Sequence, residues 1–140
     1  MKKIFIHGLV ASGLAAIASI IYSNIYQEAL GAVFNKVINI GSIAGASVFG
    51  CMLMAVGYAL LKKFNKQNLT GWLNVLIAVL SFVSIISPIS MSLPLDIESP
   101  EFFPGLVVPM HFFPALAFFV VAPFLGMQNM SSFFNGEFKK

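Results

Sequence analysis

Four long apolar stretches dominate the pattern of hydrophobic and polar positions along the chain. They cover residues 4–26, 37–61, 71–89 and 107–127, and their interiors contain no Asp, Glu, Lys or Arg. A helix needs about 20 apolar residues to cross a hydrocarbon core of about 30 Å. The pattern therefore predicts an all-α integral membrane protein with one four-helix domain over residues 1–140. Because short connections make sequence neighbours antiparallel, we expect an up-down-up-down bundle.

The composition agrees with a chain whose outer surface meets lipid. Hydrophobic residues make up 59% of the chain and charged residues 9%, whereas a soluble domain carries about 25% charged residues. The lipid bilayer is therefore the expected partner. The net charge of +3 comes from lysines. Without an arginine or a basic patch with interleaved aromatic residues, it does not indicate nucleic-acid binding.

The lysines predict the orientation of the chain in the membrane. Seven fall on one side of a four-span arrangement: Lys2, Lys3, Lys62, Lys63, Lys66, Lys139 and Lys140. Lys36 alone falls on the other side. The positive-inside rule therefore places both termini in the cytoplasm. A signal peptide is the competing interpretation of the first stretch, but the apolar run continues past the Ala16-Ile17-Ala18 motif, so we expect an uncleaved helix.

Small residues suggest where the helices meet, because close packing drives helix association in lipid. The first stretch carries a stripe that includes Gly8, Ser12, Ala15 and Ser19, and the second carries Gly41, Gly45 and Gly50. Gly41 and Gly45 form a Gly-x-x-x-Gly motif. We expect this motif to pack the second helix against the first, and a homodimer face is the alternative.

The stretch from residue 88 to residue 114 is chemically unusual. It contains six of the seven prolines, three of the five acidic residues and one of the two histidines. Pro114 leaves the carbonyl of Met110 without its helical partner and should bend the helix, whereas Pro109 is placed near the helix start. Three prolines and three acidic residues precede this helix in a loop that we interpret as a lid. The spacing of its carboxylates matches no calcium loop.

His111 is the main candidate for a functional residue, because ionisable groups inside membranes are costly and tend to be functional. Polar residues expected at the same depth are Asn24, Asn39, Ser42, Ser84, Ser87 and Asp96. We expect an outward-facing ligand pocket around His111 and Pro114. The alternative is an interfacial histidine that bonds a loop carbonyl. Serines at positions 81, 84 and 87 suit either bonds within or between helices, or a polar cavity wall.

His7 is expected near the cytoplasmic boundary, in contact with head groups. It should lie about 20 Å from His111 along the membrane normal, which argues against a haem held by both histidines. Cys51 is the only cysteine, so neither an intramolecular disulfide nor a cysteine-based zinc site is possible. No metal site, cofactor or catalytic motif is predicted. Residues 128–140 are expected to form an amphipathic segment or a frayed tail.

Three features together resemble a known family. Ser87-Pro88 ends the third helix, an acidic proline-rich loop follows, and Pro109-Met110-His111 opens the fourth helix. This pattern resembles a family of small bacterial four-helix membrane proteins of unknown function. The resemblance implies a bacterial inner-membrane protein and points to Pro88 and His111 as pattern positions. It implies no activity.

We therefore expect a non-enzymatic inner-membrane protein that binds a small amphipathic ligand, or a partner's helix, at an outer-leaflet pocket near His111. One alternative is an accessory subunit of a larger respiratory or transport complex, since catalytic groups are absent and the helices have glycine-rich faces. Another is a small transporter formed by oligomerisation. That alternative lacks a charged coupling residue within a span.

Overall fold

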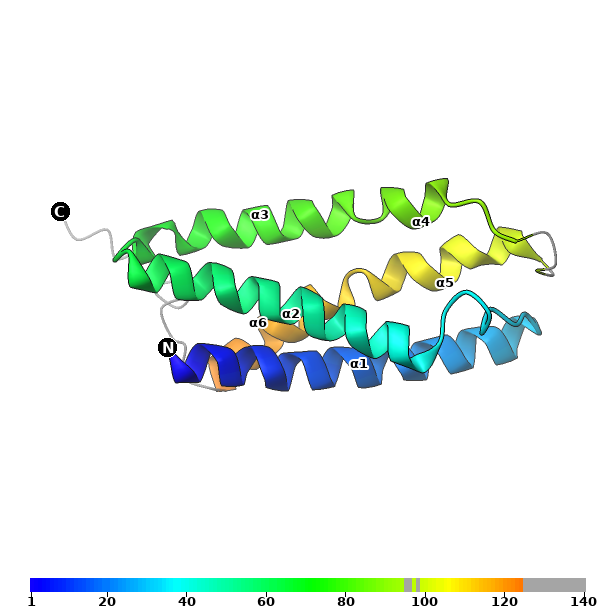
Figure 1. Cartoon of the computed structure of the whole chain (residues 1–140), viewed down its shortest axis with the longest axis horizontal. Helices are drawn as coiled ribbons and strands as arrows, with labels where there is room; N and C mark the ends of the chain where they lie inside the picture. Colours follow the sequence, from blue (N-terminus) through cyan, green and yellow to red (C-terminus); the bar gives the residue numbers. More distant parts are fainter. Residues whose placement is uncertain (95–96, 98, 125–140) are drawn as a thin grey trace.

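The computed structural model describes residues 1–94, 97 and 99–124, and the regular elements among them are all helical (Figure 1). The first two helices are α1 (Lys2–Leu30) and α2 (Ile40–Lys63). The third helical segment comprises η1 (Gln67–Leu69), α3 (Thr70–Val83) and α4 (Ile86–Ser90). The fourth comprises η2 (Pro100–Phe102), α5 (Phe103–Met110) and α6 (Phe113–Phe124). The predicted amphipathic tail lies outside the described residues.

Among the described residues, four helical segments are long and apolar enough to cross a membrane: Lys2–Leu30, Ile40–Lys63, Gln67–Ser90 and Pro100–Phe124. The prediction of an all-α chain with four such segments is confirmed. In Figure 1 the amino terminus of α1 lies at the same end as the connection from α2 to α3. The connections that follow α1 and α4 lie at the other end.

The fourth helical segment begins earlier than predicted. We expected residues 91–106 to form a loop that prolines keep out of a helix, but helical structure starts at Pro100. Pro100 and Pro104 each occupy the first turn of their element, where a missing N–H leaves no helical bond unmade. As a consequence, Pro109 lies inside α5 rather than at the start of the segment, which corrects its predicted place.

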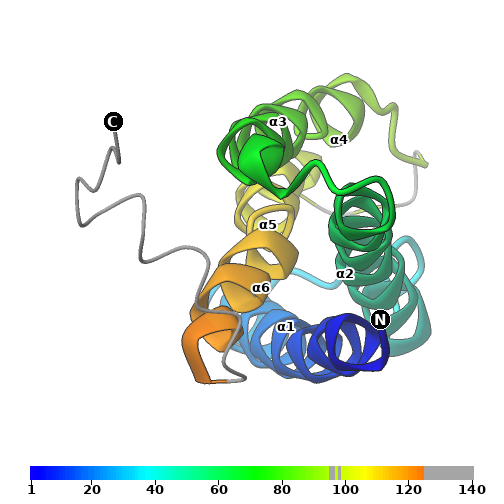
Figure 2. The same ribbon diagram turned by 90° about the vertical axis from the view of Figure 1, so that its left-hand side faces the viewer.

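The core is built where α1 meets α2 and α6 (Figure 2). Alanines at 11, 15 and 55 are completely buried, and so is the Cys51 side chain. Helices α1 and α2 approach closely at Gly8, where an added Cβ would lie 2.9 Å from the Cβ of Ala55. Small side chains thus let the two backbones pack closely, as expected for helices that associate in lipid.

The Gly-x-x-x-Gly motif does not take part in this contact, so its predicted role between the first two helices is wrong. Gly41 and Gly45 are both exposed. A Cβ on Gly45 would meet no described atom within 4 Å, and one on Gly41 would meet only the Asn39 side chain. Gly50 instead faces α6, where its Cβ would lie 3.3 Å from Pro114. The homodimer interpretation of Gly41 and Gly45 stays a prediction.

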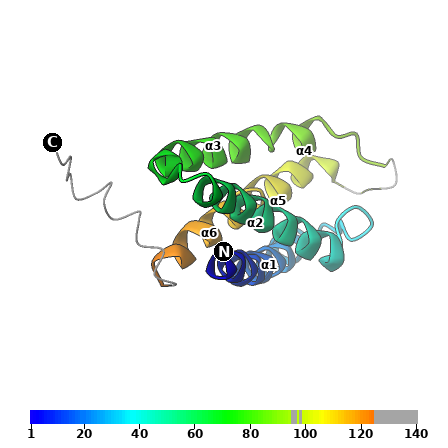
Figure 3. The same cartoon turned by 60° about the vertical axis from the view of Figure 1, so that its left-hand side comes forward.

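Helix α3 lies at the edge of the bundle (Figures 2 and 3). Ile77 is its only buried residue. It is linked to α2 by a hydrogen bond from the Tyr58 hydroxyl to the Asn74 side-chain oxygen. The adjacent residues Gly57 and Leu73 lie next to each other as well. Because so little of α3 packs against its neighbours, space remains between this helix and the rest of the bundle.

We predict that Gly8→Ala destabilises the protein while Gly13→Ala does not. Both changes replace a glycine in the same helix, which by itself stabilises a helix by about 0.5–1 kcal/mol. At Gly8 the new methyl group meets Ala55, and overpacking costs about 1–3 kcal/mol. At Gly13 no described atom lies within 4 Å. Unfolding titrations in detergent measure the difference, and equal stability of the two variants would contradict the contact.

Candidate ligand-binding site

A cavity of about 700 Å³ lies between α2, α3 and the α5–α6 segment. Most of its wall is apolar, formed by leucine, isoleucine, valine, methionine, phenylalanine and alanine side chains. Its polar wall residues are His111 and five serines: Ser19, Ser42, Ser47, Ser81 and Ser84. No charged residue lines it among the described part of the chain. The space exists because α3 stands away from the core.

The structure brings together only part of the predicted site. His111, Pro114 and Ser84 line this cavity, together with Ser42. Asn24 and Ser87 are exposed and do not line it. Asp96 lies outside the described residues.

Asn39, also predicted at the site, begins α2 instead. Its side-chain oxygen accepts a hydrogen bond from the Ser42 N–H at 2.9 Å. The Ser42 hydroxyl in turn accepts from the Asn39 N–H at 3.0 Å, which completes a capping box. This arrangement satisfies backbone donors that a helix start leaves free. Asn39 thereby sets the position of Ser42 in the cavity wall without lining the cavity itself.

The helix breaks beside the cavity at His111. The N–H groups of His111 and Phe112 bond carbonyls three residues earlier, those of Val108 and Pro109, and α6 begins at Phe113. Pro114 has no N–H for the carbonyl of Met110, and an interior proline bends or breaks a helix. The bend predicted from Pro114 is therefore confirmed as a break between α5 and α6 (Figure 1).

The His111 ring takes over a backbone bond that the break removes. Its Nδ1 lies 2.9 Å from the carbonyl oxygen of Val107, whose usual donor would be the His111 N–H. A carbonyl oxygen can only accept, so Nδ1 carries the proton in this contact. In the neutral ring, Nε2 is then an acceptor. The histidine thus bonds a carbonyl of its own helix rather than a loop carbonyl.

The cavity serines of α2 and of the α3 segment form hydrogen bonds within their own helices. The hydroxyls of Ser81 and Ser84 donate to the carbonyls of Ile77 and Ser81, and Ser47 donates to Ile43, all at 2.8–2.9 Å. Bonds to the preceding turn are therefore present, and the same serines also line the cavity. The two interpretations of the serine spacing hold together, because a hydroxyl that donates to its own helix still presents lone pairs to the cavity.

Ser19 is a cavity residue that sequence reasoning placed only in a packing stripe. Its side chain is 2% exposed, and within the described part of the chain its hydroxyl has no hydrogen-bond partner. Buried polar groups are seldom left unbonded. The combination of burial, a free hydroxyl and a place in the cavity wall marks Ser19 as a candidate ligand contact. In the sequence, Ser12 and Ser19 belong to the same helical stripe of small residues. Nothing in that pattern distinguishes a serine that packs between helices from one that lines a cavity.

His7 corrects a second expectation. We expected contact with head groups, but the side chain is completely buried. Nε2 lies 2.8 Å from the carbonyl oxygen of Phe118 in α6, and the two rings are tilted by 37° with centroids 4.1 Å apart. Nδ1 has no partner among the described residues. His7 is therefore part of the contact between α1 and α6, and it does not line the cavity.

Two tyrosines of α1 hold the start of the fourth helical segment. The Tyr22 hydroxyl donates to the carbonyl of Gly105 at 2.8 Å, and the Tyr26 hydroxyl donates to that of Phe102 at 2.9 Å. The Gly105 carbonyl is the one that Pro109 deprives of its helical N–H. Gly105 also leaves room for Tyr26, because a Cβ there would collide with the tyrosine hydroxyl. These contacts fix α5, and with it the position of His111.

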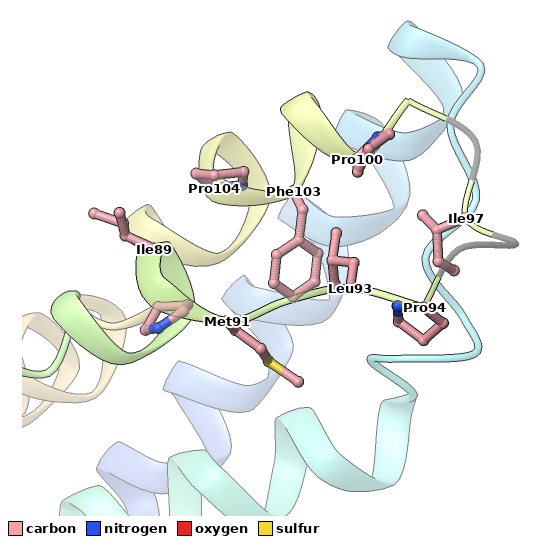
Figure 4. A pocket seen from close by; sticks show the side chains of 9 residues that line it. Ile89, Met91, Leu93, Pro94, Ile97, Pro100, Phe103 and Pro104 are labelled. Atoms are coloured by element: carbon pink, nitrogen blue, oxygen red, sulfur yellow. The ribbon is translucent and has the colours of Figure 1, made fainter.

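A separate, smaller cavity of about 380 Å³ lies between α4, the residues after it and the start of α5 (Figure 4). Its wall includes Met91, Leu93 and Pro94 from this connection and Phe103 and Pro104 from α5. None of its wall residues lines the larger cavity. The described part of the expected lid therefore packs over the start of α5 instead of lining the cavity of His111.

The fold and the cavity together define a class. Four helical segments with the length and composition of membrane spans, and an apolar cavity between them, indicate a multi-pass membrane protein. Among the described residues, no group of three His, Cys, Asp or Glu side chains could hold a metal ion. Comparison of the chain with family models, curated proteins and solved structures finds no match.

We predict that Tyr22→Phe destabilises the protein by about 1–3 kcal/mol, because it leaves the Gly105 carbonyl without a donor. In a Pro109→Ala background the same change should cost less, since the new N–H at position 109 can bond Gly105 as in a regular helix. A double-mutant cycle of unfolding in detergent measures this coupling. Additive effects of the two substitutions would contradict the replacement of the helical bond by Tyr22.

Proposed function

We propose that the chain is a bacterial inner-membrane protein with an up-down-up-down bundle and cytoplasmic termini. Two observations support the orientation. Seven of the eight lysines belong to the termini and to the connection between the second and third apolar segments. The amino terminus and that connection also lie at one end of the structure (Figure 1). Positive charge near short loops favours the cytoplasmic side.

The orientation predicts where single cysteines react. In a Cys51→Ala background, Lys66→Cys should be protected from a membrane-impermeant maleimide in intact cells, whereas Asn35→Cys should be labelled. After lysis, both should react. The two positions lie in connections at opposite ends of the bundle, so each is the control for the other. Labelling of position 66 in intact cells with protection of position 35 would contradict the proposed orientation.

We infer that the protein binds a small amphipathic molecule in the cavity beside His111. The observation that carries this inference is a cavity of about 700 Å³ with an apolar wall and a few polar groups. Ligand sites have volumes of about 300–1,000 Å³ and this composition. The polar groups gather where α2 begins, α3 ends and the fourth segment breaks. In the proposed orientation this is the outer half of the membrane.

The rim of the cavity indicates how such a molecule enters. Phe49 and Leu53 of α2, and Leu76 and Leu80 of α3, line the cavity and are also more than half exposed. In a bilayer, exposed apolar side chains at this depth face hydrocarbon rather than water. An apolar molecule can therefore pass from the bilayer between α2 and α3 without crossing the polar interface.

Binding fits the geometry better than catalysis. The hydroxyls of Ser47, Ser81 and Ser84 donate to their own helices, so none of them donates to His111 as an activated nucleophile would. His111 itself uses Nδ1 to bond the Val107 carbonyl. The polar groups are thus held in place by the helices and are arranged to contact a ligand.

Native mass spectrometry of the purified full chain tests the proposal. We expect wild-type protein to retain an amphipathic molecule from the membrane. Ala46→Phe should weaken retention, because position 46 lines the cavity and the larger ring takes up part of its volume. Val48→Phe is the matched control, since it adds a phenylalanine to the same helix at an exposed position outside the cavity wall.

His111→Asn provides a third arm. Asparagine keeps a donor near the place of Nδ1 and lacks an atom at Nε2, so the bond to Val107 can persist while the ligand contact is lost. Retention should fall about two- to tenfold, the value of one net hydrogen bond. Equal adduct occupancy in wild type, Ala46→Phe and Val48→Phe would overturn the binding proposal.

A further inference from the structure

The cavity wall is rich in hydrogen-bond acceptors and poor in free donors. Ser47, Ser81 and Ser84 use their protons on carbonyls of their own helices. Ser42 donates to the carbonyl of Asn39 at 2.7 Å. His111 uses its Nδ1 proton on Val107, which leaves Nε2 as a lone-pair acceptor. Each of these side chains can still accept a bond from a ligand, but none has a free proton to donate.

Ser19 is the exception, and it is the only one of the five serines in the wall without a hydrogen-bond partner in the described part of the chain. Its burial, at 2% exposure, means that bulk water cannot satisfy it easily. A hydroxyl can donate and accept at once. A ligand hydroxyl that contacts Ser19 can therefore accept a hydrogen bond from it and can also donate its own proton.

The wall also lacks charge. Neither a lysine nor a carboxylate lines the cavity among the described residues. A carboxylate or phosphate head group would enter a low-dielectric space without a counter-ion, and an ammonium group would do the same. A carboxylate would in addition present only acceptors to a wall that consists mainly of acceptors. The cavity therefore disfavours charged head groups of either sign.

We propose that the ligand is a neutral molecule with an apolar body and a hydroxyl head group that donates a hydrogen bond to the wall, with His111 Nε2 as its acceptor. This inference rests on the proposed binding function and specifies the chemical class of the ligand. Long-chain, isoprenoid and polycyclic alcohols belong to this class. Fatty acids, phospholipids and long-chain ketones or ethers do not, because they are charged or lack the donor.

Three probes with the same apolar chain separate these possibilities: dodecan-1-ol, 1-methoxydodecane and dodecanoate. Each is titrated into the full chain in a nonionic detergent at a fixed detergent-to-protein ratio, and the Kd is obtained from the shift in Tm. We expect the alcohol to bind about two- to tenfold more tightly than the ether, which corresponds to one net hydrogen bond. Dodecanoate should bind more weakly than both.

Two variants test the named contact. In His111→Asn the alcohol should bind no better than the ether, since the acceptor at Nε2 is gone. In Ala46→Phe all three probes should bind more weakly, because the added ring takes up part of the cavity. Val48→Phe should retain the wild-type order, and it controls for the effect of adding a phenylalanine to α2 outside the cavity.

The outcomes distinguish this inference from the function on which it rests. Equal Kd values for alcohol and ether in wild type, or tighter binding of dodecanoate, would overturn the donor head group. If Ala46→Phe still weakened the binding of all three probes, the cavity would remain a ligand site. Failure of all three probes would overturn the proposed class, while the adduct measurement on Ala46→Phe and Val48→Phe would separately decide whether the cavity binds a ligand.

Discussion

Backbone carbonyls of the fourth helical segment need hydrogen-bond donors, and much of the structure depends on this constraint. Pro109 and Pro114 remove N–H groups from a segment that has the length and composition of a membrane span. In lipid, water cannot replace them. A side chain supplies the bond that Pro109 removes, because Tyr22 donates to the Gly105 carbonyl. At the break before Pro114, the His111 N–H bonds Val108, and the His111 ring donates to the carbonyl of Val107 in its place. His7 adds a contact to the Phe118 carbonyl further along the same segment. These contacts hold α1 against α5 and α6 and place His111 at the break.

The remaining helices share the packing unequally. Small residues bring α1 close to α2, as the contact between Gly8 and Ala55 shows, and α6 completes this core. Helix α3 contributes one buried side chain, Ile77. The space between α3 and the core is therefore a consequence of how the other three segments pack. It contains no charge among its described wall residues, and its polar groups are largely committed to the helices that carry them. Such a wall favours a neutral ligand that donates a hydrogen bond.

The polar side chains in this protein have two roles that look the same in the sequence. Asn39 caps α2, and the buried Ser12 donates to the carbonyl of Leu9 in its own helix. Ser19 shares the helix and the side-chain type of Ser12 but lines the cavity without a partner in the described part of the chain. The difference depends on the neighbouring helix. Both serines are buried, but only Ser19 borders the cavity beside α3.

The sequence by itself determined the class of protein and the four apolar helices, because span length and the exclusion of charge are local properties of the chain. It also predicted the break near Pro114, since a missing N–H has the same effect in any helix. Tertiary structure alone decided that Gly8 and Gly50 face neighbours while Gly41 and Gly45 do not. It also decided that His7 is buried and that Ser19 lines a cavity. These outcomes depend on how each helix is rotated about its axis and where it crosses the next. In a chain that is apolar on all sides, the hydrophobic pattern carries little information about that rotation.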